Sequence, residues 1–111
     1  MADEAIAAVY AVFGSDEEAR RIGREMVEAR FAACVNVFGP CHSIYRWQGA
    51  IEEADEVAAI FKTARAKVET LVAAIRAAHS YETPAVVALA IEGTDPAYRD
   101  WIMMETGAKS A

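Results

Sequence analysis

The chain has 111 residues, enough for a single domain over residues 1–111, and 55% of them are hydrophobic, which excludes a disordered polypeptide. Seventeen acidic residues against eleven basic ones give a net charge of -6 at pH 7, and this balance argues against a partner that is nucleic acid or a membrane surface. No apolar run approaches the roughly 20 residues of a membrane span.

A strand and a helix are predicted at the start of the chain. Residues 5–13 are apolar at both even-numbered and odd-numbered positions, which predicts a strand whose two faces are both covered. Gly14 ends the strand, and Ser15 with Glu18 forms the pattern of a capping box, in which the glutamate reaches back to the backbone. The helix runs to about Arg30. Its predicted buried stripe is Ala19, Ile22, Met26 and Val27.

Two further strands form a predicted hairpin. Residues 32–38 and 41–47 make one strand, and Gly39-Pro40 interrupts it with a bulge or an edge, because proline cannot donate to a sheet ladder. Gln48-Gly49 is a two-residue turn, and residues 50–63 make the next strand. At about 3.3 Å per residue this strand is longer than a globule of this size, so the hairpin must protrude or bend.

The second half of the chain completes a known order of elements. A second helix, capped by Thr63, runs to about His79, and residues 84–91 form the fourth strand. Asp95 caps a short last helix, in which Trp101 is expected to pack. The order βαββαβ plus a C-terminal helix is that of an α+β, ferredoxin-like fold, with two helices on one face of an antiparallel sheet. Since the strands are apolar on both faces, we predict a homo-oligomer that covers the second face.

Residues suited to metal binding are few and scattered. The candidate ligands are Cys34, Cys41, His42 and His79, and they form no dense ligand motif. Cys34 is either a small buried hydrophobic residue or a thiolate ligand of Cu(I). Cys41-His42 lies in the irregular segment and is expected to be accessible. His79 either caps the last carbonyls of its helix or belongs to a functional loop with Tyr81 and Glu82.

The remaining polar and aromatic candidates lie on the predicted sheet. Lys62 and Glu56 share the parity of the uncovered face, where the lysine forms an ion pair or binds an anion at a subunit cleft. Trp47, with Tyr45, is either an interface anchor or a stacking platform. No phosphate-binding loop or nucleophile elbow is present. His79 and Glu82 could serve as a base and its orienting group, but no nucleophile or cofactor signature joins them, so we predict a protein that is not an enzyme.

The expected compartment follows from the first residues and the cysteines. Residues 1–4 lack the cationic region of a signal peptide, so the chain is expected in the cytoplasm. Two cysteines in that compartment are expected to be free thiols.

Several motifs together resemble one family. They are Ala-Ala-Cys-Val-Asn at 32–36, Ile-Tyr-Arg-Trp-Gln-Gly at 44–49, Ile-Glu-Glu at 51–53, Glu56 leading to Lys62-Thr63, and His79-x-Tyr81-Glu82-x-Pro84. Over roughly residues 5–103 the chain resembles CutA, the divalent-cation tolerance protein. The resemblance implies a homotrimer in which hairpins pair across subunits, and a role in the response to copper and other divalent metals. It also implies that the clefts between subunits are lined by Asn36, Tyr45, Trp47, Lys62, His79, Tyr81 and Glu82.

The resemblance leaves three functional hypotheses. The first is copper or divalent-cation tolerance, in which copper or another divalent metal binds to the protein but is not a required cofactor. The second is a sensor similar to PII signalling trimers, which binds an anionic ligand in the clefts, although Ala50 stands where the family often has a lysine. The third is a trimer whose stability is its selected property.

Overall fold

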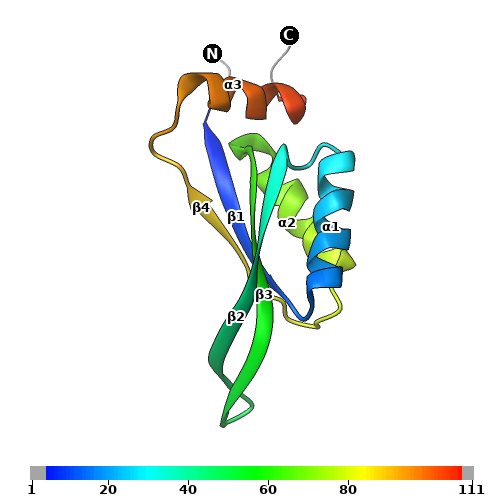
Figure 1. The fold of residues 1–111 in the computed structure, drawn as a ribbon. Coiled ribbons are helices and arrows are strands. Elements are labelled where there is room, and N and C mark those ends of the chain that lie inside the picture. Colours follow the sequence, from blue (N-terminus) through cyan, green and yellow to red (C-terminus); the bar gives the residue numbers. More distant parts are fainter. Residues whose placement is uncertain (1–4, 109–111) are drawn as a thin grey trace.

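The computed structural model describes residues 5–108. Residues 1–4 lie outside this part, and with them the prediction about a signal peptide. The structure contains a four-stranded antiparallel sheet with the strand order β2-β3-β1-β4 (Figure 1). This order confirms the predicted α+β, ferredoxin-like fold. The elements are β1 (Ile6–Phe13), α1 (Asp16–Glu28), β2 (Cys34–Trp47), β3 (Ala50–Ala64), the 3-10 helix η1 (Arg65–Lys67), α2 (Val68–Ala78), β4 (Val86–Ala90) and α3 (Pro96–Glu105).

The helices α1 and α2 cover one face of the sheet, which we call the covered face (Figure 1). Phe13 and Phe61 are fully buried there, with ring centroids 6.5 Å apart. Burying a side chain of this size contributes roughly 1.5–3 kcal/mol. The prediction that Val27 belongs to the buried stripe of α1 is wrong, because this side chain remains 36% exposed. The core cluster is Val9, Ala11, Phe13, Ala19, Ile22, Met26, Ala32, Ala59, Phe61, Leu71 and Ile75.

The start of α2 differs from the prediction. Thr63 does not cap this helix; it belongs to β3, and its hydroxyl donates to the carbonyl of Phe31 at 2.7 Å. The strand therefore continues one residue further, to Ala64, and the chain enters α2 through η1 without a side-chain cap. The strand ladder and the Phe31 contact together hold the threonine away from the helix terminus.

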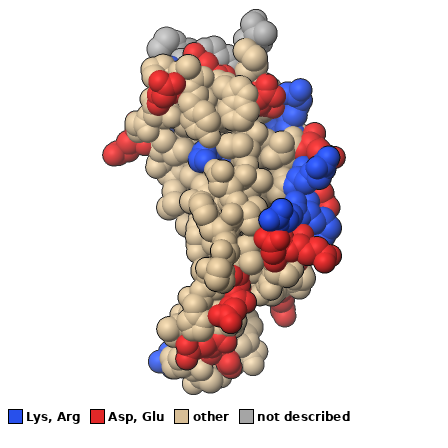
Figure 2. All heavy atoms as spheres, in the orientation of Figure 1, with Lys and Arg blue, Asp and Glu red and all other residues tan. Residues whose placement is uncertain are grey.

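The opposite face of the sheet, which we call the open face, is closed at only one end. There α3 packs on the sheet, burying Ile102 and Met103 against Ile6 and Ala64. Farther along, Phe38, Val87 and Leu89 are about half exposed. Figure 2 shows charged side chains gathered over α1 and the lower hairpin, while the surface over β1 and β4 is almost free of charge. The expected packing of Trp101 is not found within the subunit, where the ring is 42% exposed and stacks on Tyr98.

The β2–β3 hairpin extends beyond the rest of the subunit (Figure 1). The described residues span 49 Å along the longest axis and 25 and 21 Å along the others, which confirms the predicted protrusion. The turn has positive φ at both Gln48 and Gly49, the conformation that suits a two-residue hairpin loop. Among residues 5–108, no helix has the length and apolar character needed to cross a lipid bilayer.

Candidate functional site

A bulge in β2 decides which side chains the hairpin presents to each face. Phe38 pairs with Ala58, but the next pair is Cys41 with Glu56, so one extra residue of β2 is accommodated at Gly39-Pro40. Side chains alternate along a strand, so the extra residue reverses the parity of everything that follows. The predicted irregularity is thus a bulge within one continuous strand. It brings Tyr45 and Trp47 to the open face.

These aromatic residues form one wall of a groove of about 670 Å³. The other wall is the segment that precedes β4. The hairpin extends beyond the body of the subunit, and the groove lies at the point where the hairpin separates from that body. Its lining consists of Val12, Ser43, Tyr45, Trp47, Glu56, Tyr81, Glu82, Thr83, Pro84 and Ala85.

Glu56 and Tyr81 join the two walls of the groove. The Tyr81 hydroxyl donates to Oε2 of Glu56 at 2.8 Å. Burial raises the pKa of Tyr81 to about 12, and the hydrogen bond to the Glu56 carboxylate adds to this effect, so the hydroxyl stays protonated and can donate at neutral pH. Glu56 is only 9% exposed. A buried carboxylate is thus part of the lining of the groove, beside the rings of Tyr45, Trp47 and Tyr81.

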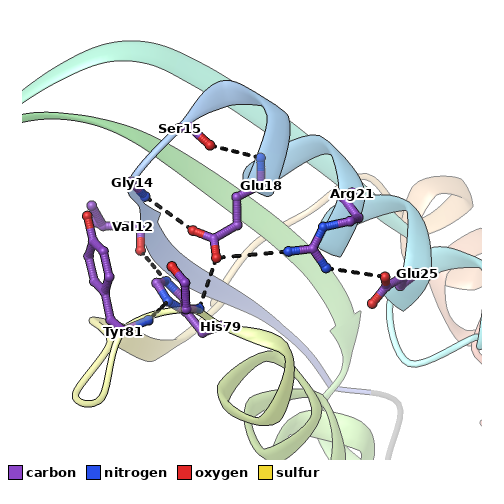
Figure 3. A network of polar contacts seen from close by, with 9 residues as sticks. Val12, Gly14, Ser15, Glu18, Arg21, Glu25, His79 and Tyr81 are labelled. Carbon is purple, nitrogen blue, oxygen red and sulfur yellow. Dashed lines mark hydrogen bonds and ion pairs between the residues drawn. The ribbon is translucent and has the colours of Figure 1, made fainter.

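His79 lies behind this groove and fixes the loop that carries Tyr81 (Figure 3). Its Nε2 donates to the carbonyl of Val12 at 2.7 Å, and its Nδ1 accepts from the backbone N–H of Tyr81 at 3.0 Å. These two bonds assign the neutral tautomer with the proton on Nε2. The ring also stacks on Phe13, with centroids 5.0 Å apart. The imidazole therefore ties the loop to the end of β1 rather than capping the carbonyls of α2.

Glu18 anchors the same loop from the first turn of α1 (Figure 3). Its carboxylate accepts from the backbone N–H groups of Ser80 at 2.9 Å and Gly14 at 3.4 Å. Burial alone would raise the pKa of Glu18, but the hydrogen bonds from Ser80 and Gly14 outweigh it and hold the pKa below its ordinary value of 4.5. Ser15 caps α1 as predicted, accepting from the N–H of Glu18 at 3.1 Å. The glutamate, however, does not reach back to Ser15 as in a capping box.

Gly14 allows Tyr81 to lie against the end of β1. A Cβ atom at this position would come within 2.9 Å of the Tyr81 hydroxyl oxygen. Real Cβ contacts are not that short, so any larger residue would push the ring away from its place beside Glu56. The glycine that ends the strand is therefore also a requirement of the groove.

Comparison with known proteins identifies the family. Residues 7–105 match the sequence model of the CutA1 divalent ion tolerance proteins. The chain belongs to this family. The divalent-cation tolerance protein CutA of Thermotoga maritima is 42% identical over 94 residues, which cover 85% of this chain and 92% of that protein. The CutA homolog of Xenopus laevis is 40% identical over 97 residues, or 87% of this chain and 64% of that protein.

Solved CutA structures share the fold. The periplasmic divalent cation tolerance protein CutA of Archaeoglobus fulgidus superposes with a TM-score of 0.88 at 39% identity, covering 91% of this chain and 98% of that one. CutA of Xylella fastidiosa gives 0.89 at 31% identity, covering 91% and 97%. The chain spans 59% of the mouse CutA protein, so it corresponds to part of the longer animal relatives. A relative from Arabidopsis thaliana is named chloroplastic and the one from Archaeoglobus fulgidus periplasmic, so the compartments named for CutA proteins differ within the family.

The residues that the CutA resemblance assigns to subunit clefts fall into two groups. Tyr45, Trp47, Tyr81 and Glu82 line the groove, and His79 supports it from behind. Asn36 and Lys62 instead lie near α3, where Nζ of Lys62 donates to Oδ1 of Asn36 at 2.7 Å. Lys62 forms no salt bridge among residues 5–108, so the ion pair weighed as one alternative is absent from the described part of the chain.

Tyr98 connects this second group to α3 and was not predicted as a site residue. Its ring centroid lies 6.0 Å from Nζ of Lys62, and its hydroxyl lies 3.3 Å from Sγ of Cys34. The contact with Cys34 and, after it, burial raise the pKa of Tyr98. Only the docking of α3 on the sheet, a long-range event, brings Tyr98 to this place, so no local sequence signal marked it. Glu56 did carry a signal, its strand parity, but its role in the groove needed the fold.

The four metal candidates have separate surroundings. Cys34 contacts Tyr98, and Sγ of Cys41 lies 4.0 Å from Oγ of Ser43. His42 lies between two carboxylates, and both ring nitrogens of His79 are engaged. Within residues 5–108, no three His, Cys, Asp or Glu side chains gather in a group suited to a metal ion. Both cysteines are free thiols, as predicted.

Proposed function

We propose that this chain contributes to tolerance of divalent cations, copper among them, as a homotrimer in the cytoplasm and without catalysing a reaction. The observation that carries the proposal is the family match over residues 7–105, which includes nearly every described residue. Relatives that match most of the chain are named divalent-cation tolerance proteins. The net charge of -6 supports it, because a negative field draws cations towards the protein.

The assembly proposed for this chain rests on its open face. Phe38, Val87 and Leu89 are 49–50% exposed in the single chain, and apolar patches of this kind mark contact surfaces. The unpaired outer edge of β2 and the protruding hairpin offer backbone groups to a neighbouring copy. Three copies would bring the open faces together. Light scattering is expected to give about three times the chain mass of 12.0 kDa.

We assign direct copper contact to the thiols Cys34 and Cys41. Thiolates are the protein ligands that Cu(I) prefers, and both residues belong to the open face by their strand register, Cys34 opposite Lys62 and Cys41 opposite Glu56. Within one chain the Cys34 sulfur has the Tyr98 hydroxyl as a neighbour, and the Cys41 sulfur has those of Ser43 and Tyr10, so a complete coordination shell would include ligands from another copy. Titration of the oligomer with Cu(I) under reducing conditions, compared with the Cys34→Ser, Cys41→Ser double variant, measures this contact.

The cellular role is tested in a host from which the gene has been removed. In raised Cu²⁺ the deletion strain is expected to grow more poorly than the parent strain. Expression of this chain in the deletion strain is expected to restore growth. The cysteine double variant separates direct from indirect action, since it would restore growth only if thiol binding is not needed. Unchanged growth of the deletion strain across Cu²⁺, Zn²⁺ and Co²⁺ would contradict the proposal.

The alternative of an anion sensor finds less support. The groove carries two carboxylates, Glu56 and Glu82, and no basic side chain lines it. Lys62 is held by Asn36 outside that lining. A thermal-shift screen with nucleotides and carboxylates is expected to leave the melting temperature unchanged. The third hypothesis, stability alone, predicts no metal phenotype in the deletion strain.

A further inference from the structure

The groove contains a negative charge that nothing in the described chain compensates. Glu56 is nine-tenths buried and lines the groove, and its one hydrogen-bond donor among residues 5–108 is the Tyr81 hydroxyl. No Lys, Arg or His of the described part forms an ion pair with it. A buried carboxylate is unfavourable unless it is paired, so the groove is electrostatically incomplete without a cation.

The walls around this charge are aromatic rather than metal-binding. Tyr45, Trp47 and Tyr81 all line the groove, and each keeps between 39% and 46% of its surface exposed. The face of an aromatic ring attracts an ammonium group, most strongly for tryptophan. A metal ion would instead need several oxygen, nitrogen or sulfur ligands, and residues 5–108 offer no such group of three.

The dimensions and the rim of the groove fit a small molecule. Its volume of about 670 Å³ lies inside the roughly 300–1,000 Å³ of small-ligand sites. Glu82 adds a second carboxylate to the lining, while Val12 and Pro84 provide apolar surface. All of these residues come from one chain, so a single subunit supplies the whole lining. The groove lies on the open face, where the proposed trimer would place a neighbouring copy, so binding is measured on the intact oligomer.

We propose that this groove is a binding site for a small organic ammonium ion. The charged nitrogen lies against the Glu56 carboxylate, and its methyl or methylene groups lie on Tyr45 and Trp47. This activity is separate from the copper contact proposed above, because it uses neither thiol.

The test uses tetramethylammonium and n-butylammonium chloride as probes at constant ionic strength. Trp47 fluorescence is followed in the intact oligomer of a Trp101→Phe background, in which Trp47 is the only tryptophan. We expect a saturable change with both cations and none with sodium chloride. The neutral n-butanol, which has the same carbon chain as n-butylammonium, is expected to bind at least about tenfold more weakly.

The variants locate the site. Glu56→Gln keeps an oxygen that accepts from Tyr81 but removes the charge, and it is expected to weaken ammonium binding about tenfold. Its matched control is Glu92→Gln, which removes the same charge from an exposed position outside the groove lining and is expected to change nothing. Should Glu56→Gln fail to fold, Tyr45→Leu on the exposed hairpin provides the second variant and is expected to weaken tetramethylammonium binding severalfold.

Three results would overturn the proposal. One is n-butanol binding as tightly as n-butylammonium, and another is equal affinity in the wild type and both groove variants. The third is the absence of a saturable response from a folded wild-type oligomer. A response that appears only after Arg46→Ala counts as this third result, because it would mean that a basic side chain of another copy fills the groove. None of these results bears on the growth tests of metal tolerance.

Discussion

The two faces of this sheet differ in how far one chain completes them. On the covered face, Phe13 and Phe61 have no exposed surface, because α1 and α2 close over them. On the open face, Phe38 and Leu89 keep about half of their surface exposed. The open face also carries polar groups, Glu56 and Lys62, whose contacts within the chain are few. Folding of one chain thus satisfies the covered face, whereas it leaves much of the open face exposed, as the proposed assembly requires.

The largest effect is expected from the covered face. Phe61→Ala removes a fully buried ring and leaves a cavity between the helices and the sheet, so the free energy of unfolding should fall by about 3–5 kcal/mol in urea titration. The matched variant Phe38→Ala, on the open face, should cost much less under conditions in which the chain is monomeric. Equal losses for the two variants would mean that the faces are equally complete.

The second prediction concerns assembly through the open face. Leu89→Asp places a charge in the middle of the apolar patch, where burial by another copy would be strongly unfavourable. Light scattering should show a fall from about three chain masses to one, with the circular dichroism spectrum retained. Ala77→Asp, on the exposed side of α2, introduces the same charge on the other side of the molecule and should leave the mass unchanged. A Leu89→Asp trimer would contradict an interface at this patch.

A third prediction addresses the loop that joins the two faces. The pKa of Glu18 is lowered in the folded chain, so its contribution to stability is present above pH 4.5 and is lost as the pH falls through the folded value. Glu18→Gln, in which the side-chain amide nitrogen cannot accept a hydrogen bond, should lower the free energy of unfolding at pH 7 by about 1–3 kcal/mol. The difference from the wild type should shrink as the pH falls from 4.5 through the folded value.

The control for this variant is Glu17→Gln, one residue earlier in the same helical turn and exposed. It changes the charge near the terminus of α1 without touching the Ser80 or Gly14 backbone. A pH-independent difference between Glu18→Gln and the wild type would show that the carboxylate has no special role in holding the loop.

The smallest expected effect concerns the pKa of His42, in the part of the hairpin that extends beyond α1 and α2. Beyond α1 and α2 one side of the sheet carries a polar cluster, in which Nδ1 and Nε2 of His42 lie 2.9 and 2.7 Å from carboxylate oxygens of Asp55 and Glu53. The hydrogen bond to Asp55, followed by that to Glu53, raises the pKa of His42 above its ordinary value of 6.5. Any stabilisation is therefore present below pH 6.5 and is lost as the pH rises through the folded value.

Proton NMR titration measures this shift directly. Asp55→Asn should move the His42 midpoint back towards 6.5, whereas Glu52→Gln, on the opposite face of the same strand, should leave it unchanged. Since these side chains are well exposed, no measurable change in unfolding is expected. An unaltered midpoint in Asp55→Asn would mean that the pair is not formed in solution.

The sequence was sufficient for the elements and for the incompleteness of one face, because periodicity and turn residues are local signals. The same signals failed at Thr63, where a contact with Phe31, distant in the chain, outweighed the local preference for a helix cap. The site was predicted less well for the same reason. Lys62 and Tyr81 were grouped together, yet they belong to different parts of the open face, and only the packed structure shows which neighbours each has.

The bulge at Gly39-Pro40 has a consequence for how this hairpin can change over evolution. Removing one residue there would make the ladder regular but keep every pair from Cys41–Glu56 to Trp47–Ala50, because the turn at Gln48-Gly49 sets that register. Tyr45 and Trp47 would therefore stay on the open face. The bulge is a point at which β2 can lose a residue without altering the aromatic wall of the groove, so we expect relatives to differ in length there more readily than elsewhere in the hairpin.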